Sequence, residues 1–289
     1  MTTDTLDSAS SVATDDTAMI QMARHLVGSN ECEIPVLPEV SLELLNLTAD
    51  VDCNPADIVA LFKRDQSLTA HLLKIANSAR YSSGQTVTSI QQAVARLGLL
   101  RVREIVFVIS CQSRVFNCPE FDEDVRASFR LSLATAAFSQ EIARSRRMNV
   151  EDAFLCGLLH DVGRPILLQS LLDRRNHDAV SGTDDELREA AAQQRIPMAS
   201  RLVLSWELPE RLATTIENQQ TPMEAEAQEK QAAILNLAID LATMVLHDET
   251  SLPSDYNHPM MSALNLYADE FKAIWNQRDA VRDWVGATL

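Results

Sequence analysis

Glycine and aromatic residues are scarce in this sequence. The chain has seven glycines among 289 residues, and aromatic residues make up only 5%. β-Sandwiches and barrels depend on aromatic and β-branched strands, and no segment here alternates convincingly between apolar and polar residues. Leu, Ala and Glu, which favour helices, are frequent instead. The composition therefore predicts an all-α fold.

Basic residues are also few. The chain carries 25 Lys and Arg against 41 Asp and Glu, which gives a formal net charge of −16. Proteins that bind nucleic acids or anionic membranes generally rely on an excess of Lys and Arg. The charge therefore disfavours nucleic acid and a membrane surface as partners.

Long apolar segments and paired cysteines are missing as well. A membrane-spanning helix needs about 20 consecutive apolar residues, and the best candidate, residues 102–111, contains Arg103 and Glu104. The acidic, polar N-terminus is unlike a secretion signal. The five cysteines form neither a CxxC pair nor a disulfide framework. We therefore expect a cytoplasmic protein with reduced thiols.

The acidic charge is unevenly distributed, which indicates how the chain is organised. Residues 31–118 carry nine acidic and eight basic residues, whereas residues 119–289 carry 28 and 16. A near-neutral and an acidic subdomain are therefore expected. The predicted segments are a disordered acidic tail at 1–17, an N-terminal helical subdomain at 18–118, a helical core at 119–250 and C-terminal helices packing on the core at 251–289.

Capping residues mark helix boundaries in the first part of the chain. Asn54 and Pro55 suit the first positions of a helix, and Ser67 is a candidate start for the next one. Ser89 is a candidate cap for a further helix, which Gly98 closes.

Three later patterns combine a capping Asn or Thr with an acidic residue three positions on, at residues 149–152, 183–186 and 221–224. The first predicts the start of a helix that Pro165 ends or kinks. The third leads toward an apolar stripe at helical spacing, formed by Ile234, Leu237, Ala238, Leu241 and Val245.

The most chemically suggestive residues are His160 and Asp161, which lie in the segment 157–164. Adjacent His and Asp on a helix can both bind a divalent metal ion, because imidazole nitrogen and carboxylate oxygen are common metal ligands. The dipeptide alone is a weak signal, since a second pair, His177 and Asp178, lies in a polar stretch without apolar flanks.

The surrounding segments resemble the HDOD family, a regulatory branch of the HD-domain superfamily. The matching segments, in chain order, are Ile34-Pro35-Val36-Leu37-Pro38, Asp65-Gln66-Ser67-Leu68-Thr69, Ala76-Asn77-Ser78-Ala79, Ser89-Ile90 with Leu97-Gly98, residues 157–163 and Trp206-Glu207-Leu208-Pro209. The resemblance covers about three quarters of the chain. It implies a multi-helix HD-like bundle with an N-terminal helical subdomain, in a cytoplasmic bacterial protein that transmits a signal to a protein partner.

The chain departs from the metal-binding pattern of HD phosphohydrolases, which use an earlier His, the His-Asp pair and a later Asp. Leu131 stands where the earlier His is expected, and leucine cannot bind a metal ion. Gln219 and Gln220 stand where relatives often carry paired His. Asp240 is a candidate for the distant ligand. Because a catalytic metal site typically needs three protein ligands, the site is interpreted as degenerate.

Three other residues are candidates for contact with a ligand or a partner. Arg164 takes the place of a Lys that often follows the His-Asp pair in relatives, and it stays cationic, so it could hold a phosphate. Asn77 and Ser78 could contact a ligand or partner, or could form a polar cap at the end of a helix.

Two functions are consistent with this pattern. The first is a non-enzymatic regulatory module that acts through protein–protein contacts, without catalytic residues or a cofactor, and with at most a weakly bound divalent metal ion at His160 and Asp161. The second is a metal-dependent phosphohydrolase acting on a nucleotide or cyclic dinucleotide, in which the same two residues bind a metal ion that activates water. Leu131 favours the first. The sequence leaves the oligomeric state open.

Overall fold

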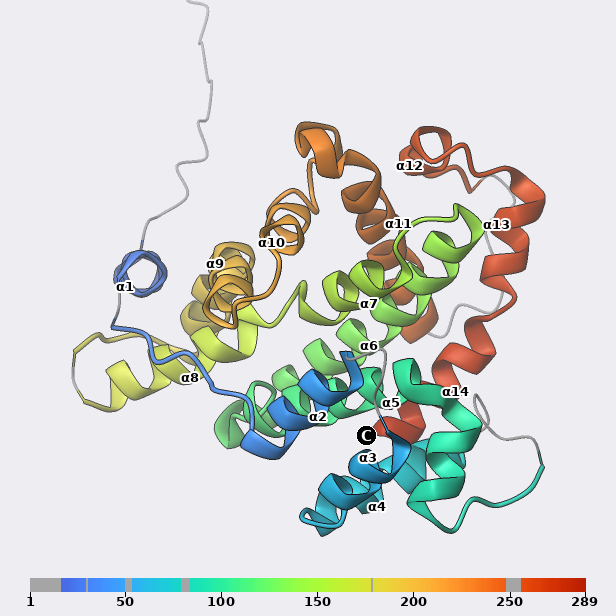
Figure 1. The fold of residues 1–289 in the computed structure, drawn as a ribbon. Helices are drawn as coiled ribbons and strands as arrows, with labels where there is room; N and C mark the ends of the chain where they lie inside the picture. The colour runs from blue at the N-terminus through green and yellow to red at the C-terminus, as the bar shows by residue number, and fades with distance from the viewer. Residues whose placement is uncertain (1–16, 30, 50–53, 79–83, 178, 248–255) are drawn as a thin grey trace, which may run out of the picture.

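The computed structural model describes residues 17–29, 31–49, 54–78, 84–177, 179–247 and 256–289 (Figure 1). Within these ranges every regular element is a helix, which confirms the all-α prediction. The α-helices are α1 (Ala18–Gly28), α2 (Glu39–Ala49), α3 (Pro55–Phe62), α4 (Gln66–Ala76), α5 (Ile90–Arg114), α6 (Asp122–Ser145), α7 (Val150–Leu159), α8 (Gly163–Asn176), α9 (Asp184–Ser205), α10 (Glu210–Glu217), α11 (Glu229–Leu246), α12 (Pro259–Ala263), α13 (Ala268–Trp275) and α14 (Arg278–Thr288).

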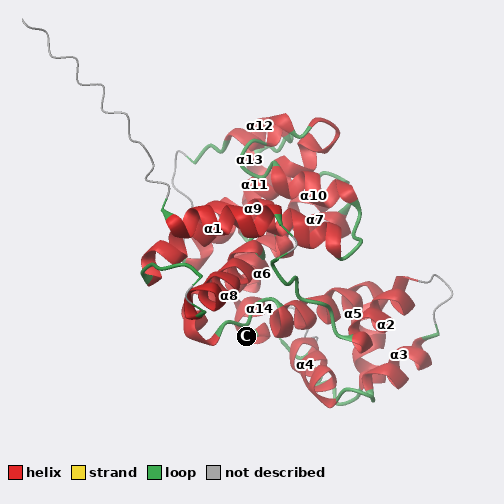
Figure 2. Cartoon of the chain, turned by 90° about the vertical axis from the view of Figure 1, so that its left-hand side faces the viewer, coloured by secondary structure: helices red, strands yellow, loops and turns green. Residues whose placement is uncertain are grey.

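The helices form a smaller lobe and a larger bundle. Figure 2 shows α2, α3, α4 and part of α5 grouped beside the remaining helices. The first helix, α1, packs on α8 and α9, so it lies with the larger bundle. At the other end of the chain, α14 contacts both α6 of the bundle and α4 of the lobe. The two parts are therefore joined by the C-terminal helix as well as by α5.

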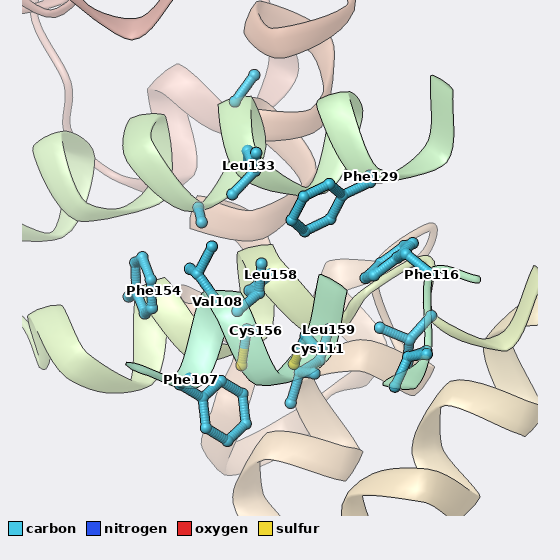
Figure 3. Packing of buried hydrophobic residues seen from close by; sticks show 14 of the residues in the cluster. Phe107, Val108, Cys111, Phe116, Phe129, Leu133, Phe154, Cys156, Leu158 and Leu159 are labelled. Atoms are coloured by element: carbon cyan, nitrogen blue, oxygen red, sulfur yellow. The ribbon is translucent and has the colours of Figure 1, made fainter. Parts of the chain in front are cut away.

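The long helix α5 connects the lobe to the core of the bundle. Its start is capped by Ser89, whose Oγ accepts a hydrogen bond from the Gln92 backbone N–H at 3.2 Å. The helix is interrupted at Gly98, which has φ of 75°, a conformation that suits glycine because it lacks a Cβ. This confirms the predicted break. Beyond it, Phe107 and Val108 pack among side chains of α6 and α7, as Figure 3 shows.

Several predicted helix starts agree with the structure. Asn54 caps α3, Asn149 caps α7, and Thr183 forms the predicted capping box with Glu186 at the start of α9. The apolar stripe of α11 is buried as expected. The first predicted segment, residues 1–17, lies outside the described residues except for Thr17, whose Oγ1 caps α1.

Three predicted helix boundaries are wrong. Helix α4 begins one residue before Ser67, because the carboxylate of Asp65 accepts the hydrogen bond from the Leu68 backbone N–H at 2.9 Å. Thr221 caps nothing with its side chain and precedes two short 3-10 turns, so α11 starts only at Glu229. Pro165 ends no helix. It lies in the first turn of α8, where a backbone N–H has no intrahelical partner to lose.

Candidate functional site

The His-Asp pair lies in the tight connection between α7 and α8, and two glycines position it. A Cβ on Gly157 would lie 2.5 Å from the Cα of Ala136 in α6. A Cβ on Gly163 would lie 1.9 Å from the carbonyl oxygen of Arg195 in α9. Only glycine permits such close approach. The two glycines therefore bring α7 against α6 and α8 against α9, and place the pair between all four helices.

Asp161 is only 2% exposed, and protein donors surround its carboxylate. Ser128 Oγ donates to Oδ2 at 2.5 Å, and Arg164 Nε donates to the same oxygen at 3.1 Å. Arg195 Nε forms an ion pair with Oδ1, also at 3.1 Å. We call Ser128, Asp161, Arg164 and Arg195 the Asp161 cluster. Hydrogen bonds and opposite charges of this kind offset the cost of burying a carboxylate.

His160 is buried beside this cluster and is held by its own helix. Its Nδ1 lies 2.8 Å from the carbonyl oxygen of Gly157, and because a carbonyl only accepts, Nδ1 carries the proton. Burial is the main cause that lowers the pKa of His160 below its ordinary value of 6.5, and the positive charges of Arg195 and Arg164 act in the same direction. The charge of Asp161 opposes them. The imidazole is therefore neutral near pH 7.

Gln219 supports the main chain of the pair. Its buried amide Nε2 donates to the carbonyl oxygen of His160 at 3.2 Å and to that of Ile216 at 3.0 Å. The main-chain carbonyl oxygen of Gln219 accepts a hydrogen bond from Asn236 Nδ2 at 2.7 Å. Gln219 stands where relatives often carry a metal-binding His. In this structure it ties the α7–α8 connection to α10 and α11.

The other residues considered as metal ligands lie elsewhere. Asp240 accepts a hydrogen bond from the hydroxyl of Tyr256 at 2.6 Å, so it belongs to the contact between α11 and the C-terminal region and not to this site. Leu131 is partly buried and packs against the hydrophobic core. Among the residues that the structure describes, no group of three or more His, Cys, Asp or Glu side chains could hold a metal ion.

Asn77 and Ser78 lie in the smaller lobe at the end of α4. The side-chain amide of Asn77 donates to the carbonyl oxygens of Leu73 and Val87, both at 2.9 Å, and its Oδ1 accepts from the Val87 backbone N–H at 2.7 Å. Ser78 Oγ donates to the Ile75 carbonyl oxygen at 2.7 Å. The bonds of Asn77 to Val87 tie α4 to the segment before α5. The third candidate, Arg164, lies apart from these two residues in the Asp161 cluster.

Two residues of the cluster could not be found from the sequence. Ser128 belongs to the same helix as Leu131, but no motif marks it. Arg195 lies in α9, far along the chain from Asp161, and reaches the carboxylate only because Gly163 allows α8 and α9 to approach.

The cluster does not suit a divalent metal ion. Both Asp161 oxygens already contact protein groups, and two of the three partners are guanidinium groups, which remain charged at every physiological pH. A metal ion there would have to displace these groups and be repelled by them. The residues present therefore do not fit a catalytic metal centre, which needs three protein ligands and an open position.

The helical architecture and the His-Asp pair at a helix junction define an HD-like protein, and comparison with solved structures confirms this fold. A protein of unknown function from Geobacter sulfurreducens with an HDOD domain aligns with a TM-score of 0.66 and 22% identity, covering 93% of this chain and 97% of that one. A Shewanella amazonensis protein, whose name proposes a metal-dependent phosphohydrolase, aligns with a TM-score of 0.66 and 18% identity over the same shares.

The family follows from the sequence comparison. Residues 34–222 match the model of the HDOD domain, so the chain belongs to the HDOD domain family. An uncharacterised protein of Treponema pallidum is 26% identical over 201 residues, which is 64% of this chain but only 37% of that protein. The chain thus spans little more than a third of that relative. None of the described helices is long and apolar enough to cross a membrane.

Proposed function

We propose that this protein is a non-enzymatic regulatory module that uses the HD-like bundle to contact a protein partner. The observation that carries the proposal is the Asp161 cluster. Arg164, Arg195 and Ser128 occupy both oxygens of the carboxylate that HD-type hydrolysis would need as a metal ligand. In this proposal His160 and Asp161 have a structural role, in which they join α6, α8 and α9.

The chemistry of arginine supports this proposal. A guanidinium group cannot lose its proton in a protein, so no accessible pH frees the carboxylate from its two cationic neighbours. Membership in the HDOD family agrees with a regulatory role. A Marinobacter aquaeolei protein whose name proposes signal transduction shares the fold, with a TM-score of 0.62 and 20% identity, covering 98% of this chain and 69% of that one.

Metal-dependent phosphohydrolysis of a nucleotide or cyclic dinucleotide is the second candidate function. One observation favours it: His160 and Asp161 remain adjacent and buried, and the lowered pKa of His160 leaves the imidazole neutral, which is the form that binds metals. This function requires Asp161 to release at least one arginine.

A hydrolysis assay separates the two candidates. The purified chain is incubated with nucleotides, cyclic dinucleotides and bis-p-nitrophenyl phosphate in the presence of Mn²⁺, Mg²⁺ or Fe²⁺. We expect no turnover above that of a His160→Ala variant. Metal-dependent turnover that disappears in this variant would overturn the proposal. The partner contact is tested by affinity capture from the native cell, followed by reconstitution with the purified partner. Failure to reconstitute any complex would remove the support for an interaction module.

A further inference from the structure

A cavity of about 360 Å³ lies where α5, α7 and the turn between α9 and α10 meet. Three aromatic side chains contribute to its wall: Phe107 of α5, Phe154 of α7 and Trp206 of the turn. Figure 3 shows Phe107 and Phe154 on neighbouring helices of the core. None of the Asp161 cluster lines this cavity, so it is a separate feature of the molecule.

Hydrogen bonds and ring contacts within the protein fix the wall of this cavity before any ligand binds. The indole Nε1 of Trp206 donates to the carbonyl oxygen of Pro35 at 2.8 Å, and its ring meets Phe107 edge-on with centroids 5.8 Å apart. Leu37, from the segment before α2, therefore lies at the same cavity as Trp206 and Leu208. Two of the motifs that carry the family resemblance, residues 34–38 and 206–209, converge here and have no part in the His-Asp site.

The cavity continues into an exposed apolar rim. Leu42 of α2 is 40% exposed and Leu100 of α5 is 48% exposed, and both line the cavity. Single exposed leucines are ordinary on protein surfaces, but here two of them line the same cavity as Phe107, Phe154 and Trp206 and add exposed apolar surface to it. The rim offers a partner apolar area to bury.

The charges on the cavity wall determine which kind of group the cavity attracts. Three carboxylates line it, those of Glu104, Glu151 and Glu207, against one guanidinium, that of Arg103. Arg103 forms an ion pair with Glu151. Glu104 is held by Arg101 and by Gln140, but Glu207 is exposed and forms no ion pair with any described residue. A basic group is attracted to this wall and an anionic nucleotide is repelled.

We propose that this cavity is the docking site for a segment of a partner protein that inserts one apolar side chain next to a Lys or Arg. The volume is at the lower end of the range for ligand pockets and suits one or two side chains. The apolar side chain fills the aromatic cavity and covers Leu42 and Leu100, while the cation meets Glu207. This inference rests on the proposed interaction function and assigns it a surface.

Selection from a library tests the proposal. Short random peptides displayed on phage are selected on the full chain, and the enriched peptides are then tested for binding to a Leu100→Asp variant, whose fold is verified by its thermal melting. The matched control is Met223→Asp, because Met223 is also exposed, at 49%, but does not line the cavity. We expect enriched peptides to combine an apolar or aromatic residue with an adjacent Lys or Arg, and to bind Met223→Asp as they bind the natural chain.

An enriched peptide is then synthesised and its affinity measured by fluorescence anisotropy. Glu207→Gln is expected to weaken binding about two- to five-fold, the usual effect of one exposed ion pair. Glu207→Lys is expected to prefer the peptide in which the basic residue is replaced by Glu. Enrichment of acidic peptides, equal binding to Leu100→Asp, or no enrichment at all would overturn the assignment of this surface.

The same variants distinguish this inference from the function on which it rests. If a captured partner binds the natural chain and Leu100→Asp equally well, the interaction function stands and the cavity is not its surface. If the chain hydrolyses a substrate and captures no partner, the proposed function itself fails.

Discussion

Ser128 and Ser132 lie one turn apart on α6, and both are buried, but their hydroxyls have different surroundings. Ser128 donates to the carboxylate of Asp161, whereas the Ser132 hydroxyl has no hydrogen-bond partner among the described residues. A hydrogen bond to a charged group is worth about 1.5–3 kcal/mol, while an unpaired buried hydroxyl is a cost to the folded state.

These surroundings predict opposite results for the same substitution. Ser128→Ala is expected to lower the free energy of unfolding by about 1.5–3 kcal/mol, because Asp161 loses a donor. Ser132→Ala is expected to leave it unchanged or to raise it by about 1 kcal/mol, because no bond is lost. Urea denaturation of the two variants measures the difference. Equal destabilisation of the two variants would show that the hydrogen bond from Ser128 to Asp161 adds nothing to the free energy of unfolding.

The buried imidazole of His160 predicts a pH dependence of stability. Its pKa in the folded protein is lowered from 6.5, chiefly by burial, so below about pH 6.5 the unfolded chain binds a proton that the folded chain does not. Stability is therefore full above this pH and falls as the solution is acidified, by up to about 1.4 kcal/mol per pH unit for this one group.

Comparison with a His160→Gln variant isolates this effect. The variant is expected to lose less stability than the natural chain between pH 7.5 and 5.5, as measured by urea denaturation at each pH. Burial also lowers the pKa of His258, but that group is present in both proteins, so its contribution cancels. Parallel loss of stability in both proteins would mean that His160 titrates normally when folded.

At the scale of the helices, the two glycines at helix contacts, Gly157 and Gly163, decide how closely the elements pack. Gly163 begins α8 directly against the backbone of α9, whereas Gly286 in α14 has open space around its Cβ position. Gly163→Ala is expected to lower the free energy of unfolding by about 1–3 kcal/mol through overpacking. Gly286→Ala is expected to raise it by up to about 1 kcal/mol, because alanine favours the helix. Thermal unfolding of both variants checks the contrast. Similar midpoints would show that α8 can shift away from α9 without cost.

Several helix starts could be predicted from the sequence, because apolar spacing and capping residues are local signals. Ser89 and Thr183 are examples whose caps agree with the structure. The sequence does not distinguish Asp65 from Ser67 as the cap of α4, since both residue types cap helices and the choice depends on which lies outside the first turn. The pair His160 and Asp161 was also visible. Its partner Arg195 was not, because a contact between separate helices leaves no periodic trace in the chain.

For the whole molecule, the two arginines beside Asp161 predict how the protein responds to chelation. A metal ion present at a hundred times its dissociation constant would stabilise the fold by about 2.7 kcal/mol, which corresponds to roughly 5–10 °C in the melting midpoint at this chain length. We expect exhaustive chelation to shift the midpoint by less than about 2 °C. A fall of about 5 °C or more that one added metal restores, and that His160→Ala lacks, would contradict this expectation.

The packing of α1 on α9 has a consequence for the synthesis of the chain. The apolar face of α1, which includes Met19, Ile20 and Leu26, is covered by α8 and α9, so it is not fully covered until α9 at residues 184–205 has left the ribosome. Translation proceeds at about 5–20 residues per second, so this delay lasts on the order of ten to thirty seconds. The smaller lobe between them can form from its own neighbouring helices during that time. Helix α1 is thus made well before the helices that cover it, and its apolar face stays uncovered while the intervening chain is synthesised.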